Sequence, residues 1–206
     1  MANNNENKIL NVPNLRFPEF SGKWKKCTLG DITINFNLRN KEKIELPMYS
    51  VTNNRGFIPQ SEQFEDRDMV GEDIKAYKII HNKDFAYNPA RINVGSIALY
   101  EMDGKGIVSP MYVCFTTKRT LLPGYLKHYF ASQTFRHEMF KRLEGSVRLC
   151  LTFDSLCNIE IPLPSIELQE NVGKYLSTIE RKISLEESML SQYQLQRSYL
   201  LSQMFI

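Results

Sequence analysis

The segment 88–91, Asn-Pro-Ala-Arg, is the first place where the residue types suggest chemistry. Amino-methyltransferases hold the target amine with an Asn-Pro-Pro-aromatic loop and need a glycine-rich strand-to-helix turn for S-adenosylmethionine. Here the second proline and the aromatic residue are missing. Gly104 and Gly106 fall in a hairpin-like turn at 103–106, which offers no helix N-terminus to support a cofactor. The sequence therefore argues against methyl transfer by this chain.

A metal-dependent nuclease is the second chemistry to test, because it needs clustered carboxylates with a lysine nearby. Asp73 and Lys75 have the Asp-x-Lys spacing, and Asp66 lies upstream in the same acidic stretch. Matches this short often arise by chance, and a solvated acidic loop is the simpler interpretation. The three histidines, His81, His128 and His137, are not spaced as metal ligands. We expect no catalytic residue, no metal and no cofactor.

Side chains that could read DNA are more numerous than side chains that could catalyse. Arg can form paired hydrogen bonds with guanine, and Asn or Gln with adenine, whereas clustered bases on a loop suit phosphates. The turn at 53–56 and Gln60 supply all three base-reading types within eight residues. An ordinary surface role is open for each candidate, and Arg91 and Asn93 could equally brace the fold. We expect base contacts from Asn53, Asn54, Arg55, Gln60, Arg91, Asn93, Lys105 and Arg148, and phosphate contacts from Arg39, Lys41 and Lys43.

The length and composition are those of an ordinary globular protein. The chain has 206 residues, of which 42% are hydrophobic and 24% charged, enough for one core and an appendage. The net charge of +3 is uneven, with bases outnumbering acids in the blocks 16–55 and 117–159. Two such blocks could form one polyanion-binding face, although scattered charge explains them as well. The four cysteines form no Cys-x-x-Cys pair, and no apolar run approaches the roughly 20 residues that a membrane span needs. We therefore expect a soluble cytoplasmic protein.

The elements that must position these side chains are strands first and helices afterwards. Short β-rich runs are predicted at 48–52, 96–100 and 111–115, with the turn at 103–106 between the last two. Apolar residues at helical spacing then run from Leu126 to Leu143, which predicts one helix. This order predicts the α+β class. We expect a disordered leader at 1–12 and a globular domain of twisted sheet, hairpins and helices at 13–164.

A long coiled-coil helix is predicted for residues 165–206. Residues 166–205 contain no proline and a single glycine, Gly173, and Ser165 can cap the start. A 4,3 repeat selects ten positions, of which Glu186 and Arg197 are charged. The eight apolar positions are Val172, Leu176, Ile179, Ile183, Leu190, Tyr193, Leu200 and Met204. A helix of about 60 Å cannot bury this stripe on a domain of this size, so we expect a partner helix. A helix folded back on its own core is the alternative.

Four segments together resemble the specificity subunit of type I restriction-modification systems. They are LRFPEFSGKWKKCTLGDI, YNPARINVGSIAL, GIVSPMYVCF and IPLPSIELQENVGKYLSTIERKI, in this order from about residue 12 onwards. The last contains a Leu-Pro-x-x-x-x-x-Gln helix start at Leu163, Pro164 and Gln169, and a Leu-Leu-x-x-Met-Phe tail follows it. Specificity subunits usually hold two target-recognition domains, and this chain has one.

The resemblance implies a non-catalytic chain that binds double-stranded DNA. It would direct a modification subunit, which is an adenine methyltransferase, and a restriction subunit, which is an ATP-dependent translocase and nuclease. The two long helices of a full-length subunit pair antiparallel. The single helix here therefore implies that the chain pairs with a second copy of itself or with another specificity chain, and that the helix also docks the modification subunit. For a homodimer, the resemblance implies an interrupted palindrome as the DNA target. The alternatives are a single-chain DNA-modifying or DNA-cleaving enzyme and a coiled-coil scaffold without a DNA role.

Overall fold

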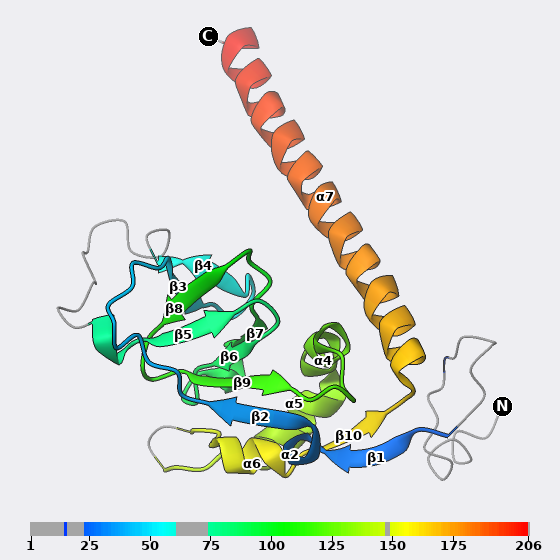
Figure 1. The fold of residues 1–206 in the computed structure, drawn as a ribbon. Helices are drawn as coiled ribbons and strands as arrows, with labels where there is room; N and C mark the ends of the chain where they lie inside the picture. The colour runs from blue at the N-terminus through cyan, green and yellow to red at the C-terminus, as the bar shows by residue number, and fades with distance from the viewer. Residues whose placement is uncertain (1–14, 16–22, 61–73, 147–148, 206) are drawn as a thin grey trace.

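A globular part and one long projecting helix make up the molecule (Figure 1). The structure is a computed structural model that describes residues 15, 23–60, 74–146 and 149–205. Strands and short helices form the globular part, and α7 (Ile166–Met204) projects from it. The predicted α+β class is confirmed. The predicted leader at 1–12 lies outside the described residues.

Two four-stranded sheets and one two-stranded sheet form the β structure of the described ranges. The first sheet is antiparallel and contains β2 (Thr33–Phe36), β9 (Val113–Thr117), β6 (Phe85–Tyr87) and β7 (Ile97–Leu99), in that order. The second contains β4 (Phe57–Pro59), β3 (Met48–Val51), β8 (Lys105–Val108) and β5 (Lys78–His81), in that order, with β3 parallel to β8. The third pairs β1 (Lys25–Thr28) with β10 (Glu160–Leu163) and so joins the two ends of the globular part.

Short helices and a large aromatic core cover the first sheet. The helices are α2 (Leu29–Ile32), α4 (Pro123–Phe130), α5 (Gln133–Phe140) and α6 (Phe153–Cys157), and the 3-10 turns are η1 (Ile74–Ala76) and η2 (Ile92–Val94). The rings of Phe85 on β6 and Phe115 on β9 are stacked with centroids 5.1 Å apart. Phe130 of α4 meets both rings edge-on. Burial of these rings anchors the helices to the sheet.

The second core lies between the two four-stranded sheets and corrects one prediction. Residues 105 and 106 belong to strand β8, so the predicted turn at 103–106 is wrong for its second half. A Cβ atom on Gly106 would lie 2.7 Å from the ring of Tyr49 and 2.8 Å from the hydroxyl oxygen of Tyr100. The glycine is therefore needed for close packing inside a buried strand, a reason that local turn patterns do not reveal. The flanking β-rich runs form β7 and β9, which pair with β6 and not with each other.

The single helix predicted from Leu126 to Leu143 is two helices. α4 ends at Phe130, and Ser132 caps α5 by accepting a hydrogen bond from Phe135 N at 3.2 Å. A capping serine favours a new helix start over continuation, because its side chain satisfies a backbone N–H that would otherwise be unpaired.

Gln169 fastens the base of α7 to the globular part. Its side chain is almost fully buried. The Oε1 atom accepts a hydrogen bond from Leu122 N at 2.8 Å, and Nε2 donates to Thr120 O at 3.1 Å and Pro164 O at 3.0 Å. Because Thr120 and Leu122 precede α4, one side chain holds the start of α4 and the start of α7 together.

Two further contacts between α4 and α7 extend this junction. Gly173 is buried against the backbone of Gly124, and a Cβ atom on Gly173 would lie 3.6 Å from the Gly124 carbonyl carbon. The buried ring of His128 lies 3.1 Å from Ser177 Oγ through Nε2 and 3.3 Å from Glu180 Oε1 through Nδ1. The first turns of α7 therefore belong to the globular body.

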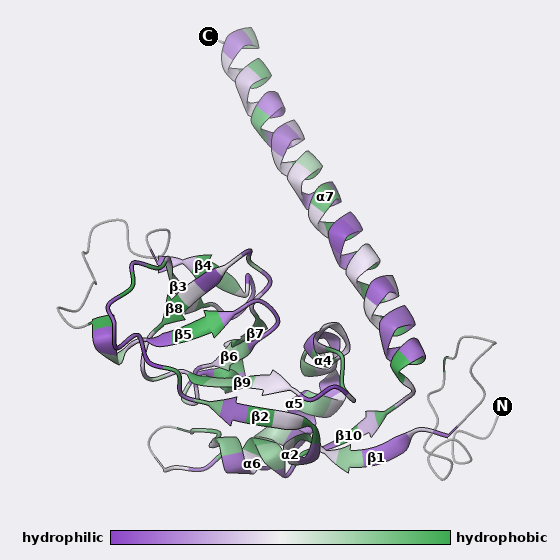
Figure 2. Cartoon of the chain, viewed as in Figure 1, coloured by the Kyte–Doolittle hydropathy of each residue, from purple (hydrophilic) through white to green (hydrophobic). Residues whose placement is uncertain are grey.

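The remainder of α7 extends away from the globular part. Every residue from 178 to 205 is exposed, and the whole helix is about 58 Å long at about 1.5 Å per residue. The structure does not support the alternative of a helix folded back on its own core (Figure 1). Figure 2 shows hydrophobic positions recurring between hydrophilic ones along its length. Among the described helices, none is long and apolar enough to cross a membrane.

Candidate nucleic-acid interface

The β3–β4 turn presents three of the predicted base-reading side chains. Asn53, Asn54 and Arg55 are exposed. Thr52 holds the turn, because its N–H and its Oγ1 both donate to Gly56 O at 2.9 Å, and its Oγ1 accepts from Arg55 N at 3.0 Å. Gly56 has φ +63°, in the left-handed region that glycine occupies without strain. The turn is a fixed platform for polar side chains.

A second turn, η2 with its flanking residues, carries Arg91 and Asn93. The Oδ1 atom of Asn88 accepts a hydrogen bond from Ala90 N at 3.0 Å, and Arg91 O accepts from Ser96 N at 3.1 Å. The side chain of Asn88 is therefore engaged in its own turn. Arg91 is exposed, and Asn93 is half-buried.

The fold brings these two turns into contact although they are about 40 residues apart in sequence. Gly95 has φ +100°, and a Cβ atom there would lie 2.7 Å from the carbonyl oxygen of Asn53. The buried Ser96 donates through Oγ to Val51 O at 2.9 Å. The structure thus unites Asn53 and Asn93, from the two predicted reading segments, in one surface.

A hollow of about 230 Å³ lies where α5 meets both turns. Asn53 and Asn93 line it from one side, and Gln133 and Arg136 line it from the first turn of α5. We call these four residues the reading cluster. Gln133 and Arg136 were not predicted, because the apolar repeat concealed the break between α4 and α5. Ser132, a helix-capping residue within that repeat, was the available signal.

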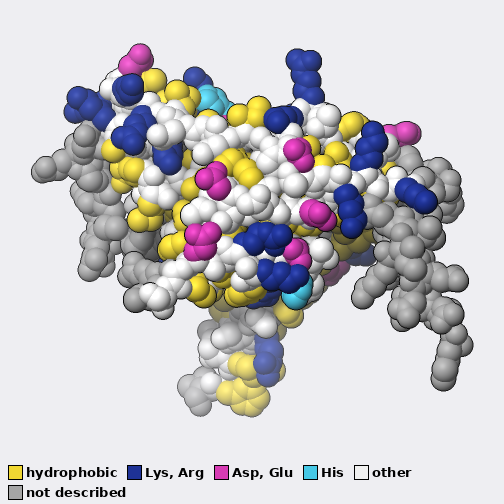
Figure 3. All heavy atoms as spheres, turned by 90° about the horizontal axis from the view of Figure 1, so that it is seen from below, with side chains coloured by type: hydrophobic (Ala, Val, Ile, Leu, Met, Phe, Trp, Pro, Cys, Tyr) yellow, Lys and Arg dark blue, Asp and Glu magenta, His cyan; other side chains and the backbone are white. Residues whose placement is uncertain are grey.

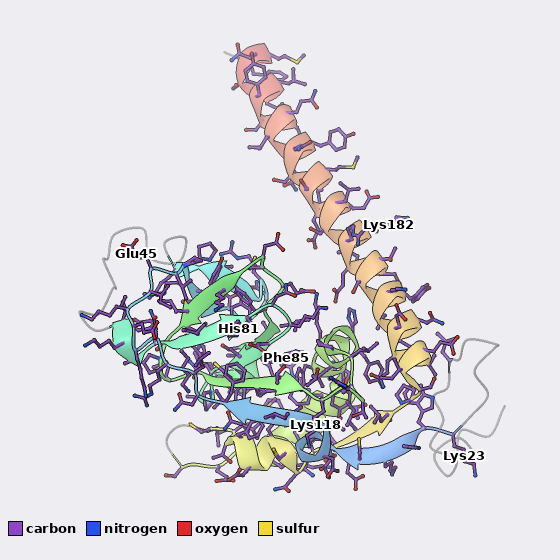
Figure 4. The ribbon with its side chains drawn as sticks, in the orientation of Figure 1. Lys23, Glu45, His81, Phe85, Lys118 and Lys182 are labelled. Atoms are coloured by element: carbon purple, nitrogen blue, oxygen red, sulfur yellow. The ribbon has the colours of Figure 1, made fainter. Side chains whose placement is uncertain are left out.

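The predicted phosphate-binding loop is braced by a residue that the sequence did not single out. Asn40 is buried, donates through Nδ2 to Ile44 O at 2.9 Å and accepts from Ile44 N at 2.9 Å. This closed pair of hydrogen bonds exposes Lys41 and Lys43 on the loop, and Lys43 has φ +52°. Figure 4 shows Glu45, at the end of this loop, on the side of the globular part away from the base of α7.

Strand register places the loop and the β3–β4 turn beyond the same end of the second sheet. Arg39 bridges to Lys78, which pairs with Val108, which in turn pairs with Tyr49. These four residues lie side by side across the sheet. Beyond them β3 continues towards Asn53, and the loop that carries Lys41 and Lys43 continues from Arg39 past Tyr77, just before β5. Lys105 pairs with His81 at the opposite end, so the structure does not bring Lys105 to the reading cluster.

The other predicted residues are distributed as follows. Gln60 directly follows β4 and is half-buried, and Arg148 lies outside the described residues. Asp66 and Asp73 also lie outside them, and Lys75 is exposed on η1. Within the described part of the chain, no group of three or more His, Cys, Asp or Glu residues could hold a metal ion.

Charge on the globular part is mixed. Figure 3 shows Lys and Arg side chains spread across one face with acidic side chains between them. On α5, Glu138 accepts hydrogen bonds from Lys141 at 2.7 Å and Arg142 at 2.6 Å, and these bonds lower the pKa of Glu138 to about 2. These two cations are thereby partly neutralised, whereas the exposed Arg136 is placed at the hollow.

The fold is a single globular α+β part with a long projecting helix (Figure 1). The family model described as type I restriction modification DNA specificity domain matches residues 21–193. The chain belongs to this family, as its sequence motifs predicted.

Solved structures share the fold at low sequence identity. One similar chain comes from a structure that describes the complex assembly and conformational transition of the type I R-M system. It has 16% sequence identity and a TM-score of 0.59, and the match covers 94% of this chain and 46% of that chain. The HsdS subunit from Thermoanaerobacter tengcongensis has 18% identity and a TM-score of 0.58, with coverages of 90% and 50%. The S subunit from M. genitalium has 16% identity and a TM-score of 0.54, with coverages of 88% and 46%. The chain spans about half the length of these proteins. Comparison with curated protein sequences gave no match.

Proposed function

We propose that this chain reads one half-site of a DNA target and positions separate modification and restriction subunits on it. The observation that carries the proposal is the contact between the β3–β4 turn and η2, which unites Asn53 and Asn93 in a domain of the DNA specificity family. Amide and guanidinium groups held on braced turns have the fixed geometry that base-edge readout requires. The lysines at 41 and 43 would add phosphate contacts that set the register.

Catalysis would belong to partner subunits. The partners would be an adenine methyltransferase as modification subunit and an ATP-dependent translocase and nuclease as restriction subunit. Asn88, the nearest approach to a methyltransferase motif, is engaged in its own turn. The exposed part of α7 would pair with a second specificity chain, because its apolar positions otherwise face water. Two copies of this chain would then read an interrupted palindrome.

The test compares base readers with phosphate contacts. Asn93→Ala should reduce discrimination at one base pair by about 1–3 kcal/mol, because a base-edge contact is lost. Lys41→Ala with Lys43→Ala should weaken binding to all sequences alike and reduce the log-log salt slope by about 0.9 per lost contact. Both are measured by binding to specific and random duplexes over a range of salt concentrations, with the modification subunit present. Equal losses on both kinds of DNA for Asn93→Ala would show that the reading cluster is misplaced.

The two alternative functions give different results with purified protein. A single-chain enzyme would turn over DNA with S-adenosylmethionine or Mg²⁺ and no partner subunit. A scaffold without a DNA role would show no salt-dependent DNA binding even with the modification subunit present.

A further inference from the structure

Val94 is an exposed apolar side chain inside an otherwise polar surface. It follows Asn93 on η2 and lines the same hollow as the reading cluster. Val94 is 48% exposed, whereas Ile92, on the same turn, is 2% exposed and packs in the first core. The turn is therefore anchored through Ile92 and presents Val94 to the solvent. A single exposed valine is ordinary on a protein surface, so its surroundings must show what it contacts.

The backbone on both sides of Val94 is held in place. Val94 N donates a hydrogen bond to Arg91 O at 3.2 Å, and Gly95 N donates to Ile92 O at 3.0 Å. The next contact is the close approach of Gly95 to the carbonyl oxygen of Asn53. A β-branched side chain also has few rotamers open to it. The isopropyl group of Val94 is therefore presented at the hollow in a nearly fixed position.

The first turn of α5 supplies the opposite wall of the hollow. Phe135 and Met139 are each 2% exposed and fix the helix to the core. Gln133 and Arg136 are exposed and line the hollow. This alternation follows the helical period, so one face of α5 is anchored and the other faces outward. The cap at Ser132 fixes the start of the helix, and with it the position of Gln133.

The polar groups around the hollow are available to a ligand. Among the described residues, the side-chain amides of Asn53, Asn93 and Gln133 have no hydrogen-bond partner. Arg136 likewise forms no ion pair with a described carboxylate. The amide of Gln169, by contrast, makes three hydrogen bonds within the chain. The hollow therefore combines one fixed apolar group with several unengaged donors and acceptors.

This combination matches the edge of an A·T base pair in the major groove. Thymine presents a C5 methyl group there, and adenine presents the N6 donor and the N7 acceptor. An apolar side chain can contact the methyl group, and the amide of Gln or Asn can pair with N6 and N7. The minor groove displays neither feature. The major groove is about 12 Å wide and admits an α-helix, so the first turn of α5 can enter it.

We infer that Val94 packs on the C5 methyl group of one thymine in the half-site, and that Gln133 reads the adenine paired with that thymine. Val94 and Gln133 belong to different elements, η2 and α5, so they can contact the two bases of one pair together. The exposed Arg136 adds positive charge beside them. This inference rests on the proposed function and goes further, because it names the chemical group that one residue recognises.

Base analogues test the two contacts separately. Each thymine of the methylated half-site is replaced in turn by uracil, which differs only by lacking the methyl group. Binding by the full chain with the modification subunit should weaken about three- to fivefold at one position, as expected for the loss of one buried methyl group. Replacement of the paired adenine by 7-deazaadenine, which lacks the N7 acceptor, should weaken binding at the same base pair.

Two variants assign each contact to its side chain. Val94→Ala should bind the thymine and uracil duplexes equally and keep its sensitivity to 7-deazaadenine. Gln133→Ala should show the opposite pattern. Ile34→Ala is the matched control, because Ile34 is 49% exposed on β2 and does not line the hollow, and it should keep both sensitivities. All three positions are exposed, so urea titrations should give the same unfolding midpoint as the unaltered chain.

Several results would overturn the inference. A half-site without thymine, no thymine sensitive to uracil, or a sensitivity that survives Val94→Ala would each refute the methyl contact. Sensitivities at two different base pairs would refute the assignment of Gln133 to the same pair. In these cases the same titrations would still show a preference for the half-site over random DNA, and the proposed function would stand. No preference over random DNA would refute the proposed function and the inference with it.

Discussion

Duplicating residues 188–194 within α7 should lengthen the spacer between the two half-sites. Seven residues are one heptad, so the duplication keeps the 4,3 repeat in phase. It also preserves the apolar stripe of α7, because the copies of Leu190 and Tyr193 continue the same 4,3 spacing. At about 1.5 Å per residue, the two recognition domains move apart by about 10 Å.

A displacement of about 10 Å corresponds to at most about three base pairs of spacer, at about 3.4 Å per base pair. This maximum applies when the axis of α7 runs parallel to the DNA. Three base pairs also rotate one half-site about the duplex, so the modification rate at the new optimum should fall. The assay is methylation, with the modification subunit, of a DNA library in which the half-sites are fixed and the spacer varies. Deletion of residues 188–194 is the matched variant and should shorten the spacer by a similar amount.

The half-site sequence should stay the same in both variants, because the recognition domain is untouched. An unchanged spacer optimum would refute the reasoning that α7 sets the distance between readers. A changed half-site sequence would refute the separation of reading from spacing.

Three further changes test the junction, the reading cluster and the acid stability of α5. Gln169→Leu should lower the free energy of unfolding by about 2–5 kcal/mol in urea titrations, because three backbone groups lose the hydrogen-bond partner that the almost fully buried Gln169 side chain supplies. Gly95→Ala should relax base discrimination in duplex binding assays, because its Cβ atom would meet the carbonyl oxygen of Asn53 at 2.7 Å. Gly104→Ala is its control, since that glycine also has positive φ (+81°) but no atom within 4 Å of the added Cβ. The lowered pKa of Glu138 means that its contribution to stability is present above about pH 4.5 and is lost as the pH falls through about 2. The stability difference from Glu138→Gln, no more than about 1 kcal/mol for an ion pair that is partly exposed to solvent, should therefore vanish over that window in pH-dependent denaturation.

The sequence predicted the parts of this fold that depend on local pattern. Strand β3 and the turn at 53–56 follow from a β-rich run and a Gly-ended polar tetrapeptide, and α7 follows from its 4,3 repeat. Gln169 was noticed as part of a motif, but its role depends on backbone groups more than 40 residues away. Such partners cannot be read from spacing along the chain.

The candidate interface was predicted only in part for the same reason. Asn53 and Asn93 were proposed separately, and only the packing of Gly95 shows that their turns meet. Gln133 was missed because an apolar repeat continued across a helix break. Lys105 was assigned to a turn because glycine is common in turns and Gly106 follows it. In the structure, Gly106 lies in a strand where only a glycine leaves room for the rings of Tyr49 and Tyr100. Long-range packing decided the first and the last of these cases, and the local cap at Ser132 decided the second.

On the proposed function, this chain chooses the DNA sequence on which another subunit acts. Single-molecule sequencing of methylated adenines in genomic DNA tests it most directly, in cells that contain the modification subunit with or without this chain. We expect an interrupted palindromic motif that is methylated only when the chain is present, and whose half-site preference relaxes at one base pair in Asn93→Ala. A methylation pattern that is the same with and without the chain would contradict it.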